Sequence, residues 1–250
     1  MTKTDRAVLI TGASRGIGRA VAAAFAANGD RVAIHHRGSP DLAARLLDEL
    51  PGNGHAVVQA DLTDPEAVRA MVDTAAQQLA GLDVLVNNAG VFLAHPLLDS
   101  SYQHWQQMWR RTIDTNLVAA ANLTWCAVRH MRPGGRIVNV SSRGAFRGEP
   151  DSPAYGASKA GLNALGQSLA VALAPHGIAV TTVAPGFVET DMTNEHLKPP
   201  RGDAIRAQSP FDRVARPEEV AEAVRWLASP GAEWASGTIV DLNGASYLRS

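Results

Sequence analysis

The chain has 250 residues, of which 46% are hydrophobic and 19% are charged, and its formal net charge is −1 at pH 7. Because the basic residues are scattered, this balance argues against a nucleic-acid partner. No apolar stretch approaches the about 20 residues of a membrane span, residues 1–6 lack the apolar core of a secretory signal, and a lone Cys126 cannot form an internal disulfide, so a cytoplasmic protein without membrane contact is expected.

Strands and helices are predicted to alternate along the whole chain, with no repeat and no low-complexity linker. The strands are expected at 7–11, 31–35, 55–60, 83–86, 135–141, 178–184 and 238–242, and the helices at 16–28, 40–50, 65–80, 101–131, 153–174 and 217–228. Parallel strands need crossover helices. The pattern therefore predicts an α/β fold with one domain over residues 1–250: a doubly wound, seven-stranded parallel sheet with helices on both faces.

A glycine-rich turn joins the first strand to the first helix, with the spacing G-x-x-x-G-x-G. Gly12 permits a tight turn, Gly16 lets backbone amides approach a diphosphate, and Gly18 allows close packing of helix on strand. A helix N-terminus also attracts anions. The turn is thus predicted to bind a dinucleotide through Gly12, Ser14, Arg15, Gly16, Ile17 and Gly18, with a plain loop as the alternative.

The second predicted strand ends at His36-Arg37, where a dinucleotide fold meets the adenosine ribose. An acidic residue there would hold the 2′-hydroxyl of NAD, whereas an arginine suits the 2′-phosphate of NADP. Arg37 and Arg15 therefore favour NADP(H), with NAD(H) possible. A solvated loop charge is the alternative for Arg37. His35 and His36 face opposite sides of a strand, so no metal site is expected.

Tyr155 and Lys159 stand one helical turn apart, and Ser142 ends a strand upstream of them. A phenol has an ordinary pKa of about 10, so the nearby Lys159 charge is expected to lower the pKa of Tyr155 and improve proton transfer. The Ser142 hydroxyl could orient the same carbonyl oxygen. The alternative is a packed tyrosine beside a solvated lysine.

The segment 187–216 lacks a strong period and contains Pro199-Pro200 and Gly202. It is predicted to be a lid over the substrate, with an ordinary surface excursion as the alternative. The helix before it, 153–174, is rich in alanine and glycine, which allows close helix contacts within one subunit or between two.

Taken together, the motifs resemble those of the short-chain dehydrogenase/reductase family over almost the whole chain. The glycine turn at 11–18 is followed in order by Asp61-Leu62, Asn87-Asn88-Ala89-Gly90, Asn116, the set Ser142, Tyr155 and Lys159, and Pro185-Gly186-Phe187-Val188-Glu189-Thr190. The resemblance implies a Rossmann fold, NAD(P)-dependent exchange between a carbonyl and an alcohol, and a homodimer or homotetramer of two-fold symmetry.

The resemblance also implies roles for individual residues. The catalytic tetrad would be Asn116, Ser142, Tyr155 and Lys159, with Asn116 holding a water in a proton relay through Lys159. The further cofactor contacts would be Asp61 and Leu62 near the adenine, Asn88, Ala89 and Gly90 in the cleft, Tyr155 and Lys159 themselves, and Pro185, Gly186, Val188 and Thr190 near the nicotinamide. The structural alternatives are a strand cap for Asn88, a helix kink for Asn116 and a turn for Asp61.

Within the family, the sequence is most similar to bacterial 3-oxoacyl-carrier-protein reductases, which makes a carrier-protein- or CoA-linked 3-oxoacyl group the expected substrate. Where those enzymes carry arginines that dock the acidic carrier protein, this chain has Pro133 and His176, with Arg129, Arg132 and Arg136 nearby. A ketone or aldehyde reductase, or alcohol dehydrogenase, acting on a free small molecule is therefore the alternative. A non-catalytic dinucleotide-binding regulator is the alternative of another class.

Side chains near the expected pocket indicate a medium, mostly apolar substrate. They are Phe92, Leu93, Ala145, Phe146 and Phe187. Arg143 directly follows Ser142, and it could pair with a substrate carboxylate or point to solvent.

Overall fold

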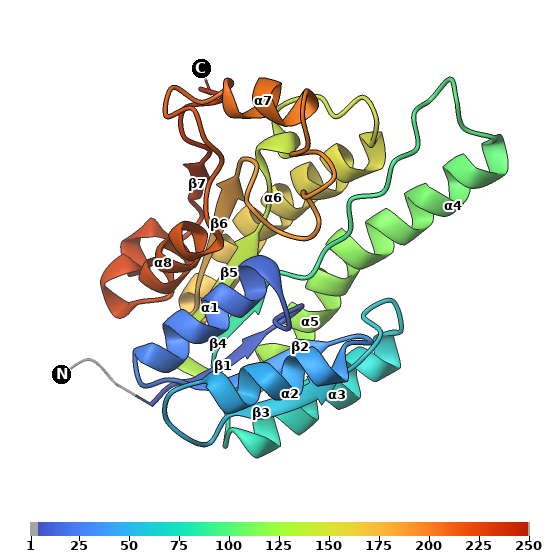
Figure 1. The fold of residues 1–250 in the computed structure, drawn as a ribbon. Helices are drawn as coiled ribbons and strands as arrows, with labels where there is room; N and C mark the ends of the chain where they lie inside the picture. Colours follow the sequence, from blue (N-terminus) through green and yellow to red (C-terminus); the bar gives the residue numbers. More distant parts are fainter. Residues whose placement is uncertain (1–4, 250) are drawn as a thin grey trace.

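The computed structural model describes residues 5–249, so both ends of the predicted domain, residues 1–4 and 250, lie outside the described residues. A single seven-stranded sheet with the order β3-β2-β1-β4-β5-β6-β7 crosses the molecule, and every pairing is parallel (Figure 1). The order reverses between β1 and β4, and in open α/β sheets ligands bind outside the carboxyl ends of the strands at such a point. The doubly wound α/β fold expected from the sequence is confirmed.

The strands begin and end close to the predicted positions. They are β1 (Ala7–Ile10), β2 (Arg31–His36), β3 (Ala56–Gln59), β4 (Leu82–Asn87), β5 (Met131–Val140), β6 (Ala179–Pro185) and β7 (Ile239–Leu242). The exception is β5, which begins at Met131 because Met131 pairs with Leu82 across an irregular register. The Pro133-Gly134-Gly135 sequence inside this extension favoured a turn, and the neighbouring strand overrides that local preference.

The helices are α1 (Gly16–Ala27), α2 (Pro40–Glu49), α3 (Pro65–Gln78), α4 (Tyr102–Ile113), α5 (Ala119–Ala127), α6 (Pro153–Leu173), α7 (Arg201–Arg206) and α8 (Pro217–Leu227). The helix predicted over 101–131 is interrupted, because a π-helical turn, Asp114–Val118, separates α4 from α5. The 187–216 segment contains the short α7, which no sequence period had indicated.

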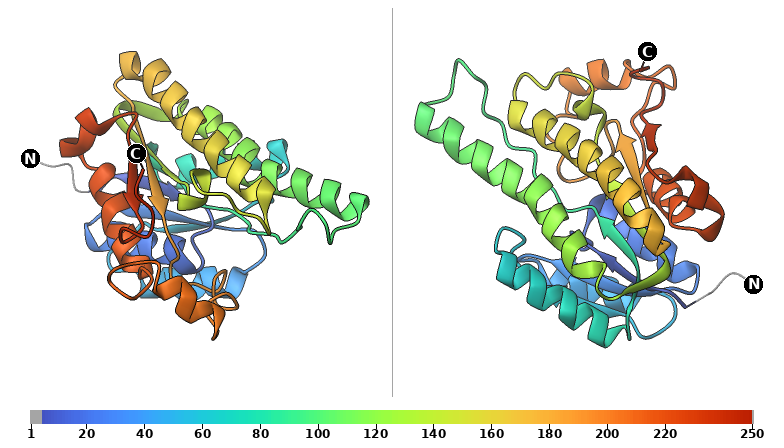
Figure 2. Two further views of the ribbon diagram at one scale, coloured as in Figure 1. Left: turned by 90° about the horizontal axis from the view of Figure 1, so that it is seen from above. Right: turned by 180° about the vertical axis from the view of Figure 1, so that it is seen from behind.

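Two apolar clusters cover the two faces of the sheet. Val8 and Ile10 of β1 pack with α1, α2 and α8 in one cluster, whereas Leu9 of the same strand packs with α3, α5 and part of α6 in the other. Successive residues of a strand point to opposite faces, so a continuous apolar strand such as β1 serves both layers. Figure 2 shows these helices on the two sides of the sheet.

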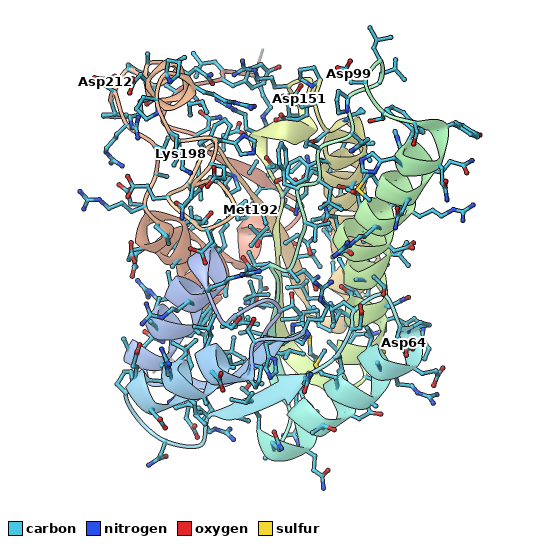
Figure 3. All side chains as sticks on the ribbon, turned by 45° about the vertical axis from the view of Figure 1, so that its right-hand side comes forward. Asp64, Asp99, Asp151, Met192, Lys198 and Asp212 are labelled. Atoms are coloured by element: carbon cyan, nitrogen blue, oxygen red, sulfur yellow. The ribbon has the colours of Figure 1, made fainter. Side chains whose placement is uncertain are left out.

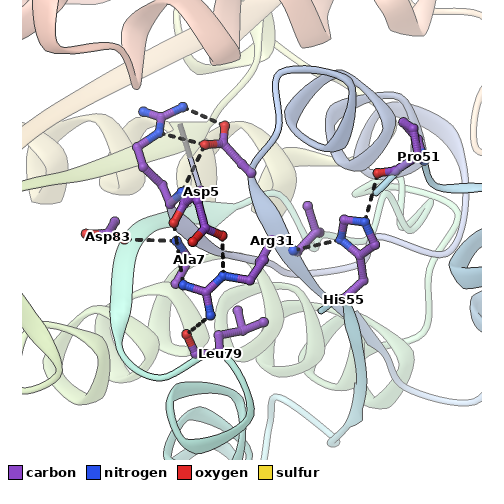
Figure 4. A network of polar contacts seen from close by, with 10 residues as sticks. Asp5, Ala7, Arg31, Pro51, His55, Leu79 and Asp83 are labelled. Atoms are coloured by element: carbon purple, nitrogen blue, oxygen red, sulfur yellow. Dashed lines mark hydrogen bonds and ion pairs between the residues drawn. The ribbon is translucent and has the colours of Figure 1, made fainter. Parts of the chain in front are cut away.

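At the amino-terminal edge of the sheet, where the strands begin, neighbouring strands are joined by ion pairs and side-chain hydrogen bonds (Figure 4). Arg6 donates to both carboxylate oxygens of the buried Asp30, at 3.0 and 2.8 Å. Arg31 pairs with Asp5 at 2.6 Å, and the backbone N–H of Ala7 donates to Asp83 at 2.9 Å. These contacts join the starts of β1, β2 and β4. Within residues 5–249, every helix is too short or too polar to cross a bilayer.

Loops and the 187–216 segment gather at one end of the molecule, where Asp99, Asp151, Lys198 and Asp212 all lie (Figure 3). This end also receives the carboxyl ends of β5 and β6, whose next residues include Ser142 and Gly186. In open α/β sheets, this is the edge at which ligands bind.

Candidate functional site

The glycine turn has the backbone that a diphosphate cradle requires. Gly12 and Gly16 adopt φ values of 63° and 54°, a region that favours glycine. A Cβ at Gly18 would lie 2.3 Å from the backbone oxygen of Gly12, so only glycine fits there. Arg15 at the N-cap of α1 makes no side-chain cap, and the first turn holds no acidic residue. The first amides of α1 are therefore free of competing carboxylates, and the turn fits a dinucleotide diphosphate.

Asn88 fastens this turn to the end of β4. Its Nδ2 donates to the backbone oxygens of Thr11 and Gly12, at 2.8 and 3.2 Å. The backbone N–H groups of Asn88 and Ala89 each donate to Thr11 Oγ1 at 3.0 Å. A Cβ at Gly12 would lie 3.1 Å from Ala89 Cα, so the two segments pack backbone to backbone. Asn88 thus has a structural role, which the sequence analysis named as the alternative to a cofactor contact. It keeps Ala89 and Gly90 beside the glycine turn.

His35 is a second residue that anchors the glycine turn. The sequence analysis considered it only as a candidate metal ligand. The backbone N–H of Gly12 donates to its Nδ1 at 3.0 Å, and its Nε2 lies 3.2 Å from the backbone oxygen of Ala60. Nδ1 must therefore accept and Nε2 must donate, which is possible only for the neutral ring. Burial lowers the pKa of His35 to about 4 and keeps the ring neutral. Its position at the end of a buried strand next to the turn was the available signal.

The residues predicted to contact the ribose and the adenine differ in exposure. The Arg37 side chain is exposed, as is that of Arg15, whereas His36 and Leu62 are buried. Asp61 accepts hydrogen bonds from the backbone and hydroxyl of Thr63, which together lower the pKa of the Asp61 carboxyl. Asp61 therefore shapes the turn that leads to α3, which is the structural role named as an alternative in the sequence analysis. The positive charge of Arg37 also lowers the pKa of its carboxyl.

Tyr155, Lys159 and Ser142 meet at the carboxyl end of β5. The Nζ of Lys159 lies 5.8 Å from the centre of the Tyr155 ring and donates to the backbone oxygen of Val140 at 2.8 Å. Ser142 Oγ accepts from the backbone N–H of Gly144 at 3.0 Å and also hydrogen-bonds to Tyr155. Ser141 Oγ donates to the backbone oxygen of Lys159, which ties α6 to the strand.

The pKa values of this group correct one sequence expectation. Burial raises the pKa of Tyr155 to about 12, although the hydrogen bond to Ser142 opposes the rise. Burial likewise lowers the pKa of Lys159 to about 8. The net lowering of the Tyr155 pKa that the sequence predicted is therefore not found, because desolvation by burial outweighs the opposing effects. Both groups are desolvated, and the Lys159 ammonium is directed at the Val140 carbonyl.

Asn116 occupies the centre of the π-helical turn between α4 and α5. Its side chain accepts from the backbone N–H of Val91 at 2.8 Å and donates to the Val91 oxygen at 3.0 Å and to Ser158 Oγ at 3.1 Å. A Cβ at Gly90 would lie 3.3 Å from Asn116 Oδ1 and 3.5 Å from Lys159 Nζ. Asn116 therefore both stabilises the helix interruption and lies beside Lys159. π-Helical turns are frequent at functional sites.

Three residues that the sequence analysis did not place at the site, His196, Glu149 and His95, support it together with Phe92, which was expected near the pocket. The Phe92 ring packs edge-on against Tyr155 and His196, with centroids 4.8 and 5.5 Å apart. The half-buried Glu149 carboxylate acts electrostatically on Tyr155, and burial raises its own pKa. His95 is fully buried, and its Nε2 accepts the backbone N–H of Ala154, the residue before Tyr155, at 3.2 Å. Only Glu149, a charged residue between Ser142 and Tyr155, had a position in the sequence that could have indicated a role.

The Pro185-Gly186 motif carries the chain from β6 into the 187–216 segment. A Cβ at Gly186 would lie 3.1 Å from Asn243 Cβ, and Val188 is buried and bridges to Ala215. A Cβ at Gly16 would lie 3.2 Å from Thr190 Cγ2. The start of this segment thus touches the glycine turn, and the predicted cofactor residues from both motifs border one region.

The small residues of α6 serve contacts inside the subunit. A Cβ at Gly161 would lie 2.8 Å from Leu117 Cδ2, and a Cβ at Gly166 would lie 2.9 Å from Thr182 Oγ1. Larger residues would push α6 away from its neighbours and move Tyr155 and Lys159 with it.

Comparisons with known proteins agree with this geometry. The family model described as "Enoyl-(Acyl carrier protein) reductase" matches residues 12–244. The chain is 36% identical to the 3-oxoacyl-[acyl-carrier-protein] reductase FabG of Staphylococcus aureus (strain Mu50), over 98% of this chain and 100% of the relative. It is 36% identical to the enzyme of the same name from Vibrio cholerae serotype O1, over 99% and 100% of the two chains.

A solved structure similar to this chain is a short-chain dehydrogenase from Burkholderia cenocepacia J2315 in complex with NADP. The TM-score is 0.89 at 35% identity, and the match covers 96% of this chain and 97% of the other.

Proposed function

The chain belongs to the short-chain dehydrogenase/reductase family of oxidoreductases, and we propose that it interconverts a carbonyl and a secondary alcohol with NADP(H), using Tyr155 as proton donor and acceptor. The observation that carries the proposal is convergence: Tyr155, Lys159, Ser142 and Asn116 gather at the same sheet edge as the glycine turn. The positive φ values and uncapped amides of that turn fit a dinucleotide.

Bound NADPH would supply the hydride that reduces the carbonyl carbon. In that direction Tyr155 gives its phenolic proton to the carbonyl oxygen, and the reverse reaction returns the proton to Tyr155. The Ser142 hydroxyl donates a hydrogen bond that orients the oxygen. Lys159 stabilises the phenolate once the proton has left, and a water held by Asn116 beside Lys159 would supply the replacement proton. The Phe92 ring covers Tyr155 and limits access of water.

The preference for NADP(H) rests on Arg37 and Arg15. Both side chains are exposed near the end of β2 and the glycine turn, where a 2′-phosphate would be neutralised. The NADP complex of the Burkholderia relative supports the same assignment. NAD(H) remains the weaker alternative, because the diphosphate cradle does not distinguish the two coenzymes.

For the substrate, the names of the relatives support a 3-oxoacyl group linked to carrier protein or CoA. One observation favours a free ketone or aldehyde instead. Arg136, a candidate for docking an acidic carrier, is 4% exposed and pairs with Glu233 at 2.8 Å. Arg129 and Arg132 are exposed, but they precede or begin β5 and lie at the far edge of the sheet from Ser142.

The decisive experiment measures NADPH consumption by the wild-type protein. Its arms are a 3-oxoacyl thioester of carrier protein, the same acyl group on CoA, and a simple β-keto ester. A kcat/KM at least tenfold higher for the carrier-linked form would support the first substrate class, and equal values would support the free-substrate class. Binding of NADPH without turnover of any ketone or alcohol in a broad panel would instead indicate a non-catalytic dinucleotide-binding regulator.

We also propose that the chain forms a homodimer or homotetramer and works in the cytoplasm. Val118 and Trp125, beside and on α5, and Val171 on α6 are apolar side chains exposed to 42%, 57% and 78%, which is costly for an unpartnered surface. Cys126 is buried, consistent with a core role. A monomeric mass by light scattering would contradict the assembly.

A further inference from the structure

Arg143, the residue after Ser142, is a buried cation that borders a cavity. Its side chain does not point to solvent as one sequence alternative held, because the residue is 5% exposed. Nη1 donates to Gln208 Oε1 at 3.0 Å and to Ser246 Oγ at 2.6 Å, and both acceptors are neutral. Within residues 5–249, no carboxylate forms an ion pair with it. Glu149 acts on Arg143 only at longer range.

A buried cation without a counter-ion is costly. Taking a charged group out of water costs several kcal/mol unless charge and hydrogen bonds replace the lost hydration. Burial lowers the pKa of the Arg143 guanidinium, which records the same cost. An arginine nevertheless stays charged, so a bound anion would recover part of this free energy.

The cavity beside Arg143 has room for such an anion and for an apolar group attached to it. Its volume is about 320 Å³, which would hold about ten non-hydrogen atoms at the ~30 Å³ that a water occupies in the liquid. Phe187, Val214 and Leu242 are among its lining residues. Ligand pockets typically combine such apolar walls with a few polar groups.

The remaining charges in the lining cancel. Arg213 and Glu219 also border the cavity, but they hold each other through two contacts of 2.7 and 2.6 Å. Arg143 therefore supplies the unbalanced positive charge among the described lining residues. The Arg143 guanidinium lies 5.5 Å from the centre of the Phe187 ring, and a guanidinium can present two donors in one plane to a carboxylate.

We propose that this cavity binds a small carboxylic acid with an apolar body, its carboxylate on Arg143 and its body against Phe187, Val214 and Leu242. The carboxylate belongs either to the far end of the oxidoreductase substrate or to a separate acid. The described lining residues include no member of the catalytic tetrad. They do include Phe187 and Val214 of the 187–216 segment, so an occupant would hold that segment down.

The test compares benzoate with benzyl alcohol, which has a similar size and no charge. Isothermal titration calorimetry is performed on the protein saturated with NADP+. Wild-type protein is expected to bind benzoate at least tenfold more tightly than the alcohol. Arg143→Gln should abolish this preference, whereas Arg147→Gln should keep it. Arg147 is a matched control because it also donates to Gln208, at 2.8 Å, but is exposed and does not line the cavity.

A second variant guards against misfolding of Arg143→Gln. Val214→Phe leaves Arg143 in place but adds bulk inside the cavity, so benzoate binding should fall at least tenfold. Equal binding of the acid and the alcohol by wild-type protein, or an acid preference that survives Arg143→Gln, would overturn the proposal. Because binding is measured directly, this outcome is independent of the proposed catalytic activity.

Steady-state inhibition distinguishes the two sources of the carboxylate. Benzoate that competes with a neutral ketone substrate would show that the cavity receives the acid end of the substrate. Benzoate that lowers kcat or raises it without competing would assign the cavity to a separate acid. Either result, if lost in Arg143→Gln, supports the site.

Discussion

Buried charged side chains lie at both the amino-terminal and the carboxyl-terminal edge of the central sheet, but the two edges differ in how these charges are paired. At the amino-terminal edge, Arg6 is matched by Asp30 through two hydrogen bonds, so the charges compensate each other within the chain. At the carboxyl-terminal edge, Lys159 and Arg143 are 4% and 5% exposed, and neither forms an ion pair with a carboxylate of residues 5–249. One edge contributes to stability, whereas the other keeps desolvated charge available for chemistry and binding.

The difference follows from the cost of burying charge. Removing one partner of a buried ion pair strongly destabilises the folded protein, because the remaining charge is uncompensated. An unpaired buried charge already carries that cost in the ligand-free protein. A shift of its pKa or the binding of a ligand then reduces the cost. Substitutions at the two edges should therefore separate activity from stability.

The largest expected effect is on activity. Tyr155→Phe removes the proposed proton donor, so kcat should fall by about 10²- to 10⁴-fold, while the unfolding midpoint in urea stays unchanged. The measurement is NADPH consumption with the best ketone substrate. Tyr102→Phe is the matched control, because Tyr102 is 75% exposed on α4. Full activity of Tyr155→Phe would show that another group donates the proton.

The next effect is on stability. Asp30→Asn leaves Arg6 buried without its counter-charge and should lower the free energy of unfolding by about 3–5 kcal/mol, with kcat unchanged in the folded protein. Asp5→Asn breaks the exposed pair with Arg31 and should cost at most about 1 kcal/mol. Urea denaturation measures both. Similar losses in the two variants would remove the distinction between the edges.

The third prediction concerns pH. The pKa of Lys159 is about 8 in the folded protein against an ordinary 10.5, so between these values the unfolded chain binds more protons. Stability without cofactor should therefore rise from pH 7.5 to 9.5, by about 2 kcal/mol. Below pH 8 the free-energy cost of burying the charged Lys159 side chain is fully present. The pKa of Tyr155, raised to about 12, acts with the opposite sign only at higher pH.

Lys159→Met should lose this rise, because the substituted side chain carries no charge at either pH. Lys198→Met is the control, since Lys198 is exposed and pairs with Glu195. Urea denaturation at the two pH values measures the slope. An unchanged slope in Lys159→Met would mean that Lys159 is not desolvated in the free protein.

The smallest effect is on coenzyme choice. Arg37→Gln removes an exposed charge at the proposed 2′-phosphate position and should raise KM for NADPH about tenfold, equivalent to about 1.4 kcal/mol, with KM for NADH unchanged. Arg45→Gln on α2 is an exposed control. Equal changes for both coenzymes would place Arg37 elsewhere than at the 2′-phosphate.

Much of the fold could be predicted from local patterns. The apolar runs Ala7–Ile10 and Leu82–Asn87 and the alternating helices predicted the parallel sheet, and the glycine spacing predicted the turn that precedes α1. The start of β5 was missed, because its pairing with β4 outweighs Pro133 and the glycines. The interruption around Asn116 was foreseen only as a structural alternative, because its bonds to Val91 come from a distant segment.

The sequence by itself determined which chemical groups are present and how they are spaced within each element: the glycine turn, the Tyr155–Lys159 pair and the serine that follows β5. These features depend on periodicity over a few residues. Only the tertiary structure decided the protonation and availability of the charged groups. Arg143 is enclosed by Gln208 and Ser246, which lie 65 and 103 residues away. Desolvation depends on such long-range packing, so no local motif can specify it.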